Sequence, residues 1–206
     1  MRVYAVVGGT GAGKSTVSRL LARRGGVVLD ADRVGHQVLR LERVRRQLLA
    51  RFGADILGPG GAIDRGKLGA RVFGRPAALR ALEAVVHPEI VRRLGRRIAA
   101  LERRGALFVL LDAALYLDLE PALPVDAVLA VVAPRRVRAE RLRERDGLGR
   151  KQVEARLASQ PRLASWIRRA DVRLDTHCPP SELEPRVDEA LRALRRIRGR
   201  RGRRGA

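Results

Sequence analysis

The chain has 206 residues, 46% of them hydrophobic, which is enough to bury one core and to carry a small subdomain. Its longest apolar runs, at 107–111 and 127–133, fall well short of the roughly 18–20 residues of a transmembrane helix, and the run after Arg2 ends too early for an export signal, so we expect a cytoplasmic protein without a membrane span. A single cysteine, Cys178, excludes an internal disulfide and a metal site built from paired thiolates, whereas the net charge of +22 directs attention to polyanionic ligands.

The first predicted unit is a strand, a glycine-rich loop and a helix. Residues 3–7 are apolar, and residues 8–15 read G-G-T-G-A-G-K-S, which fits the phosphate-binding pattern G-x-x-x-x-G-K-[ST]. We call residues 8–15 the phosphate loop, and we expect a helix from about Lys14 to Gly25-Gly26. In such a unit backbone N–H groups and the helix dipole converge on a polyphosphate, Lys14 reaches the outer phosphates, and Ser15 ligates Mg²⁺. The chain is therefore predicted to bind a nucleotide.

Lysine is rare in this chain, which makes its presence in the loop informative. The sequence holds 44 lysines and arginines, and the only lysines are Lys14, Lys67 and Lys151. A slim ammonium group fits between phosphates where a planar guanidinium does not. The retention of lysine at position 14 thus supports the interpretation of the loop as a phosphate site.

A second short strand, at 27–29, ends in Asp30-Ala31-Asp32. Ligands of open α/β sheets bind at the carboxyl ends of strands, so we expect these carboxylates to face the nucleotide. Asp32 could accept the proton of an attacking hydroxyl or help to hold Mg²⁺; alternatively, either acid only caps the following helix. From 34 to 101 apolar residues recur with helical spacing around a loop at 58–61, which predicts a helical insertion of a size suited to binding a phosphate acceptor.

The sheet is expected to resume with strands at 107–111 and 127–133, and a last strand at 172–175 leads into a helix with Ser181 as its cap and Glu184 as the partner in a capping box. Alternating strands and helices with a phosphate loop predict an α/β fold of the P-loop NTPase type. We expect a parallel sheet of about five strands, flanked by helices, with a helical acceptor-binding insertion and a helical lid.

The lid is predicted from two arginine-rich helices, at 135–146 and 151–160, which a Gly147-Leu148-Gly149 break separates. Such a pair could close over the phosphates, exclude water and add guanidinium charge to the transition state; the alternative is that the arginines form a solvated face.

Much of the positive charge lies in the segment 192–204, which is too polar to pack and is expected to be disordered beyond about Ile197. We expect only weak, salt-sensitive and non-specific nucleic-acid binding from this tail. With 3% aromatic residues, the chain largely lacks the stacking platforms of single-strand binders.

In combination these motifs resemble the dephospho-coenzyme A kinase family over nearly the whole chain. The segments that carry the resemblance are V-G-G-T-G-A-G-K-S-T (7–16), V-L-D-A-D-R-V-G-H (28–36), F-G-A-D-I-L-G-P-G-G-A-I-D-R (52–65), L-G-A-R-V-F (68–73), L-E-A-V-V-H-P (82–88), R-L-R-E-R-D (141–146), E-A-R-L-A-S-Q (154–160) and A-D-V-R-L-D (170–175). The resemblance implies transfer of the γ-phosphate of ATP, with Mg²⁺, to the ribose 3′-hydroxyl of dephospho-coenzyme A, the last step of coenzyme A synthesis.

Roles carried over by position follow from the same resemblance. It implies that Asp32 is the general base, that Lys14 and Arg141 are catalytic, and that Ser15 and Asp32 hold the metal. The residues expected to contact ATP are Gly9, Thr10, Gly11, Ala12, Gly13, Lys14, Ser15, Thr16 and Arg145, with Arg156 nearby. The acceptor is expected to contact Asp30, Arg65 and His87. Because His87 precedes a proline, it could instead be only a helix-boundary residue, and both interpretations stay open.

The implied organisation is a nucleotide-binding core at 1–33, 105–134 and 170–198, an acceptor domain at 34–104, a lid at 135–169 and a basic tail at 199–206. The chain departs from the family pattern at D-A-A-L-Y-L-D (112–118) in place of D-x-P-L-L-F-E, at 164–166 in place of E-E-K, and at Thr176 in place of asparagine. Alternatives are another small-molecule kinase, such as one for shikimate or gluconate, although the segment 52–88 is long for those, and a nucleic-acid-associated ATPase. The oligomeric state stays open.

Overall fold

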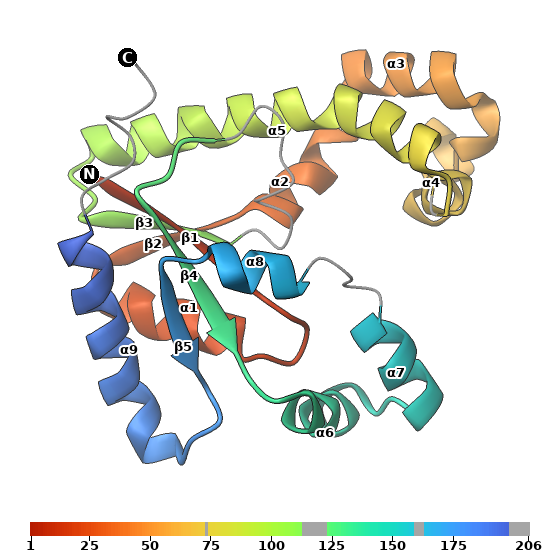
Figure 1. The fold of residues 1–206 in the computed structure, drawn as a ribbon. Helices are drawn as coiled ribbons and strands as arrows, with labels where there is room; N and C mark the ends of the chain where they lie inside the picture. The colour runs from red at the N-terminus through yellow and green to blue at the C-terminus, as the bar shows by residue number, and fades with distance from the viewer. Residues whose placement is uncertain (73, 113–122, 159–162, 198–206) are drawn as a thin grey trace. The chain divides into compact units, whose positions relative to one another are not determined.

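The computed structural model describes residues 1–72, 74–112, 123–158 and 163–197, and it contains a five-stranded sheet (Figure 1). The strands are β1 (Arg2–Gly8), β2 (Gly26–Asp30), β3 (Phe108–Asp112), β4 (Ala127–Val132) and β5 (Val172–Asp175). They lie in the order β2-β3-β1-β4-β5, and β1 pairs in parallel with β3 and β4, as β4 does with β5. The predicted α/β fold with a parallel sheet of about five strands is confirmed.

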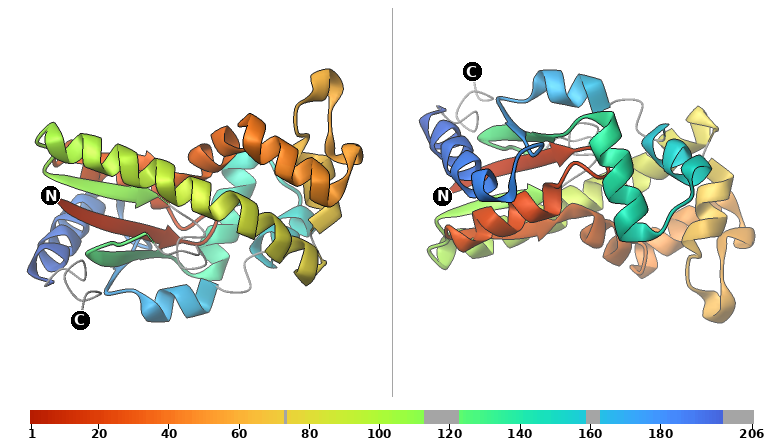
Figure 2. Two further views of the ribbon diagram at one scale, coloured as in Figure 1. Left: turned by 90° about the horizontal axis from the view of Figure 1, so that it is seen from above. Right: turned by 90° about the horizontal axis from the view of Figure 1, so that it is seen from below.

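β1 lies at the centre of this sheet, and residues 3–7 are all buried. Tyr4 and Val6 pack in one apolar cluster with α1 (Lys14–Arg23) and α9 (Pro180–Arg196), which lie side by side on the same face (Figure 2). Alternate side chains of β1 point to the opposite face, and α8 (Leu163–Arg169) packs against β1 and β4. A strand that is buried on both faces explains why residues 3–7 are continuously apolar.

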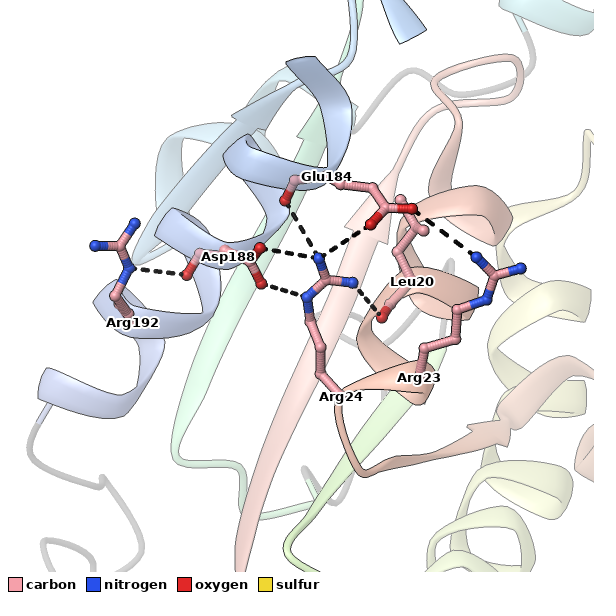
Figure 3. A network of polar contacts seen from close by, with 6 residues as sticks. All are labelled: Leu20, Arg23, Arg24, Glu184, Asp188 and Arg192. Carbon is pink, nitrogen blue, oxygen red and sulfur yellow. Dashed lines mark hydrogen bonds and ion pairs between the residues drawn. The ribbon is translucent and has the colours of Figure 1, made fainter. Parts of the chain in front are cut away.

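Arg24, directly after the end of α1, joins this helix to α9 (Figure 3). Its guanidinium forms an ion pair with Asp188, with an Nη2–Oδ2 distance of 2.9 Å, and also donates to the backbone oxygens of Leu20 and Glu184 at 2.9 and 3.5 Å. The hydrogen bonds from Arg24 lower the pKa of Asp188, and those to Asp188 raise the pKa of Arg24. The end of α1 is thus attached to the sheet's last helix by charge as well as by packing.

The start of α9 corrects one prediction, because Ser181 does not cap this helix. The helix begins at Pro180, and no side chain caps it within the described part of the chain. Proline at the first helical position has a suitable φ and no N–H group to satisfy, so the helix starts before the serine. The carboxylate of Glu184 instead lies 3.6 Å from Nη2 of Arg24 and 3.9 Å from Nη1 of Arg23 (Figure 3).

The two arginine-rich helices are α6 (Arg135–Asp146) and α7 (Arg150–Ala158), as predicted, and Gly147 ends α6 in the left-handed conformation with φ of 63°. Leu142, Val153 and Leu157 form a small apolar cluster between the two helices. The sheet, α1 and α6–α9 belong to one compact unit. Helices α6 and α7 contact each other, and α8 packs on the sheet.

Most of the second compact unit is formed by residues 30–99. Its elements are α2 (Ala31–Val38), α3 (Glu42–Phe52), the 3₁₀ turns η1 (Ala54–Ile56) and η2 (Pro59–Gly61), α4 (Arg65–Val72) and α5 (Pro76–Arg103) as far as Ala99. Asp64 caps α4 by accepting the backbone N–H of Lys67 at 3.0 Å, and this hydrogen bond lowers the pKa of Asp64. The predicted helical insertion is confirmed, and its loop at 58–61 contains a 3₁₀ turn.

Helix α5 corrects a second interpretation, because it continues through His87-Pro88 without a boundary. A proline inside a helix costs about 3 kcal/mol, but His87, Glu89, Leu94 and Ile98 on this helix are all buried. Their packing holds the helix together across the proline. No described helix, α5 included, is long and apolar enough to cross a bilayer.

Candidate active site

The phosphate loop connects the buried end of β1 to α1, and its backbone requires glycine at two positions. Gly11 and Gly13 have φ values of +80° and +85°, which residues with a side chain rarely adopt. A Cβ atom on Gly11 would also lie 2.7 Å from the backbone oxygen of Arg138 in α6. Between them, the Ala12 N–H donates to the Gly9 carbonyl at 2.9 Å and closes the turn. The loop is therefore a defined structure with no space for bulk at Gly11.

Helix α1 begins at Lys14 with Gly13 in the cap position, and no side chain caps it within the described residues. The first N–H groups of an uncapped helix and its positive dipole end together favour an anion. Ser15 and Thr16 are exposed at this end of the helix. The predicted nucleotide-binding residues 9–16 are thus brought together in one array of backbone and side-chain donors.

Lys14 forms an ion pair with Asp112, the last residue of β3. The two side chains are 18% and 17% exposed, so this pair is largely withdrawn from water. Asp112 lies opposite Val6 of β1 in the parallel register, which places the acid beside the strand that carries the loop. Asp112 was not among the predicted site residues. Its position at the end of a strand was the available signal, but strand order cannot be read from the sequence.

Three carbonyl oxygens of the loop accept hydrogen bonds from side chains of α6 and of the residue that follows β5. The pairs are Arg138 Nε to Thr10 O at 2.8 Å, Arg141 Nη1 to Gly11 O at 3.4 Å, and Thr176 Oγ1 to Ala12 O at 2.8 Å. Arg138 is 9% exposed, and its burial, with a smaller effect of Arg135, lowers the pKa of its guanidinium. Arg138 was not predicted to contact the loop, and Thr176 was noted only as a departure from the family pattern. The spacing of Arg138 three residues before Arg141 places both on one helix face.

Arg141 lies against the loop, whereas Arg145 does not contact it. Arg141 is part-buried and also donates to the hydroxyl and the carbonyl of Thr176, at 2.8 and 2.9 Å. Arg145 donates to Asp146 at 2.7 and 2.9 Å, and Arg156 donates to the same carboxylate at 3.3 Å. Hydrogen bonding from Arg145 lowers the pKa of Asp146. Among the described contacts of these three arginines, those of Arg141 include a carbonyl of the phosphate loop, and those of Arg145 and Arg156 include the carboxylate of Asp146.

Comparison with known proteins identifies the family of this chain. The model of the dephospho-CoA kinase family matches residues 2–179. A dephospho-CoA kinase of Geobacter sulfurreducens is 39% identical over 190 residues, covering 92% of this chain and 96% of the relative. One of Anaeromyxobacter dehalogenans is 40% identical over 192 residues, covering 93% and 91%. The chain belongs to the dephospho-CoA kinase family.

Solved structures share the fold of this chain. A crystal structure of a Thermus thermophilus protein has a TM-score of 0.78 and 34% identity, over 93% of this chain and 96% of that one. The structure of dephospho-CoA kinase from Campylobacter jejuni, at 22% identity and a TM-score of 0.59 over 94% and 97% of the two chains, shares the fold. Membership in this kinase family implies ATP as the phosphate donor and a small-molecule acceptor. It sets aside the alternatives of a shikimate or gluconate kinase and of a nucleic-acid-associated ATPase.

Two of the three departures from the pattern of dephospho-CoA kinases lie within the described residues. Residues 164–166 belong to α8, which packs against the sheet. Thr176 is buried beside the phosphate loop. Of the segment 112–118, only Asp112 is described, and the rest lies outside the described residues, as does the basic tail at 199–206.

Asp30, the last residue of β2, and Asp32, in α2, have different environments. Asp30 caps α2, because its Oδ1 accepts the N–H of Arg33 at 2.8 Å. Asp32 lies in the first turn of α2 with an exposed side chain, and within the described part of the chain its carboxylate has no hydrogen bond or ion pair. The capping alternative therefore holds for Asp30 and not for Asp32. In the same compact unit, Arg65 is exposed at the start of α4 and His87 is buried in α5.

Proposed function

We propose that this chain transfers the γ-phosphate of ATP to the ribose 3′-hydroxyl of dephospho-coenzyme A with residues 9–16 as the phosphate site and Asp32 as the general base. The observation that carries the proposal is the phosphate loop itself. Its left-handed glycines and the uncapped start of α1 form an array of backbone donors. Preformed donors of this kind stabilise charge in phosphoryl transfer without reorganising during the reaction.

Lys14 has a charged partner that ATP would replace. In this structure its ammonium group is paired with Asp112. Bound nucleotide offers several phosphate oxygens in place of one carboxylate, so we propose that Lys14 turns to the outer phosphates when ATP binds. Asp112 would then keep the lysine side chain ordered and charged between turnovers.

The assignment of Asp32 as the general base is supported by the different environments of the Asp30 and Asp32 carboxylates. Asp30 uses its carboxylate to cap α2 and so holds the first turn in place. The exposed carboxylate of Asp32 is then available to accept the proton of the acceptor hydroxyl. By position in the family pattern, Asp30, Arg65 and His87 would serve acceptor binding within the domain at 34–104, His87 by packing, since its side chain is buried.

Mg²⁺ fits this chain as an ion that arrives with the nucleotide. The described residues hold no group of three or more acidic, histidine or cysteine side chains able to bind a metal by themselves. Mg²⁺ in kinase sites commonly uses only one or two protein oxygens and takes the rest from phosphates and water. The exposed Ser15 hydroxyl and the Asp32 carboxylate would supply these oxygens. The bound ion would neutralise charge on the phosphates.

Arg141 is proposed to stabilise charge in the transition state. Its guanidinium lies at the loop, where Nη1 is 3.5 Å from the position of a Cβ on Gly13. Arg145 and Arg156 would join it only if the lid, residues 135–169, changes its arrangement when substrates bind. A cytoplasmic location, where ATP is supplied, and weak non-specific nucleic-acid binding by the tail complete the proposal.

The experiment that tests this function is ADP release by the purified protein with Mg²⁺ and ATP. Dephospho-coenzyme A, shikimate and single-stranded DNA are added separately. We expect stimulation by dephospho-coenzyme A alone. Turnover that responds to shikimate or DNA and not to dephospho-coenzyme A would contradict the proposal.

A further inference from the structure

We propose that Thr176 is a positioning residue whose hydroxyl orients the phosphate loop and Arg141 together. The proposal deepens the function above and rests on it, since it concerns the nucleotide side of the same site. Thr176 follows β5 directly and is only 4% exposed. Its backbone N–H donates to the carbonyl of Val132, at the end of β4, at 2.9 Å. Hydrogen bonding to β4 therefore fixes the position of the Thr176 backbone, from which the side chain extends.

The hydroxyl of Thr176 connects a cation to the loop. It accepts a hydrogen bond from Arg141 Nη1 at 2.8 Å and donates to the Ala12 carbonyl at 2.8 Å. The Val132 carbonyl, at 3.4 Å, is a more distant acceptor for the same proton. A hydroxyl has one proton and two lone pairs, so it can serve as acceptor and donor at once. A charged donor polarises the hydroxyl and strengthens the hydrogen bond that the hydroxyl donates.

The orientation of the Ala12 carbonyl determines where the next N–H group points. Peptide groups are planar and trans, so the Gly13 N–H is directed opposite to the Ala12 carbonyl. With the carbonyl held toward Thr176, the Gly13 N–H points away from Thr176. The neighbouring Ala12 N–H is already used within the loop, because it donates to Gly9. The direction of the Gly13 donor therefore depends on a side chain that lies 164 residues from Ala12 in the sequence.

The same threonine also determines where the Arg141 guanidinium lies. Nη1 and Nη2 of Arg141 donate to the hydroxyl and to the carbonyl of Thr176, and Nη1 also reaches the Gly11 carbonyl at 3.4 Å. The Thr176 side chain also lies against Gly13, since a Cβ on Gly13 would lie 3.4 Å from both Oγ1 and Cγ2 of Thr176. Thr176 thus couples a loop donor and a lid arginine, both of which the proposed function directs at phosphate.

Two matched pairs of chains isolate the hydroxyl from the shape of the side chain. Thr176→Val keeps the shape of wild type and removes the hydroxyl. Thr176→Ser and Thr176→Ala also differ only by the hydroxyl, so this second pair tests the proposal even if valine cannot be accommodated at position 176. The measured quantities are the Kd of ATP by titration calorimetry, the KM of each substrate, and the Tm of each variant.

We expect Thr176→Val to weaken ATP binding by about 10-fold, the usual effect of losing a hydrogen bond to a charged group. Thr176→Ser should bind ATP with a Kd within about 3-fold of wild type, and Thr176→Ala should bind ATP about 10-fold more weakly than Thr176→Ser. The KM of dephospho-coenzyme A should be unchanged in all of these variants. Thr176→Val combined with Arg141→Met should lose less than the sum of the two single losses, because the residues act as one network.

Equal ATP affinity in the variants with and without the hydroxyl would overturn the proposal. So would a loss in Thr176→Ser as large as that in Thr176→Val, since packing would then explain it. ATP binding is measured without the acceptor, so the two proposals can fail separately. A wild-type protein that binds ATP but does not phosphorylate dephospho-coenzyme A would contradict the proposed function alone. The role of Thr176 would still be decided by the same comparison of ATP affinities.

Discussion

Glu89 in α5 is the buried centre of a cluster of charges, and its removal should destabilise the unit formed by residues 30–99. Its side chain is 7% exposed, and it accepts hydrogen bonds from Arg92 Nε at 3.0 Å and Arg93 Nε at 3.2 Å and pairs with Arg43. Breaking a buried ion pair from one side costs about 3–5 kcal/mol. Since the three arginines are 32–50% exposed and can be rehydrated, we expect Glu89→Gln to lose about 2–3 kcal/mol.

For a chain of this size, that loss corresponds to a fall in Tm of roughly 5–10 °C, which thermal unfolding followed by circular dichroism would detect. Glu42→Gln is the matched control. Glu42 belongs to the same unit and has two arginine partners, at 3.4 and 3.8 Å, but its side chain is 65% exposed. Exposed pairs contribute about 0–1 kcal/mol, so this variant should unfold near the wild-type temperature. If both variants lost the same amount, burial would not explain the importance of Glu89, and the reasoning would be refuted.

Three further predictions concern the site, the tail and the response to acid. Asp32→Asn should lose roughly 10²–10⁴ in kcat while ATP binding persists, and a variant that kept most of its turnover would show that Asp32 is not the base. Deletion of residues 198–206 should leave kcat/KM nearly unchanged and abolish salt-sensitive binding to single-stranded DNA. A large fall in kcat/KM would contradict the expectation that the kinase activity does not need the tail. The pKa of Asp188 is lowered from 3.8 by Arg24, so its contribution to stability is present above pH 3.8 and is lost as the pH falls through the lower folded value. The difference in Tm between wild type and Asp188→Asn should therefore shrink below that pH, and a difference independent of pH would contradict this account.

Local patterns were sufficient where neighbouring residues determine the structure. The unit of β1, phosphate loop and α1, and the break between α6 and α7, depend on glycine conformations and short-range periodicity, and both were predicted with nearly their observed bounds. Two predictions from local signals, the Ser181 cap and a helix boundary at Pro88, were wrong because other effects were stronger. Proline at position 180 starts α9 before the serine, and α5 continues through Pro88 because the buried residues His87, Glu89, Leu94 and Ile98 hold the helix in place.

Some residues of the candidate site were likewise predicted from local patterns, and others were not. Lys14, Ser15 and the glycines of the loop were identified from their spacing, and Asp32 from its place after a strand. Asp112, Arg138 and Thr176 were not, although each contacts the loop or its lysine. Their partners lie 98, 128 and 164 residues away in the chain, respectively. Signals of helical or strand period extend over a few residues only, so no pattern in the sequence links such pairs.

The sequence by itself thus determined the nucleotide-binding loop, the parallel α/β fold and the helical insertion, since hydrophobic periodicity and glycine conformation act over short distances. Only the tertiary structure decided the order of the strands, and with it which acid meets Lys14. It also decided that Arg138, Arg141 and Thr176 hold the carbonyls of the loop. These contacts form because the parallel sheet brings the ends of β1, β3, β4 and β5 to one edge, where side chains far apart in the chain become neighbours.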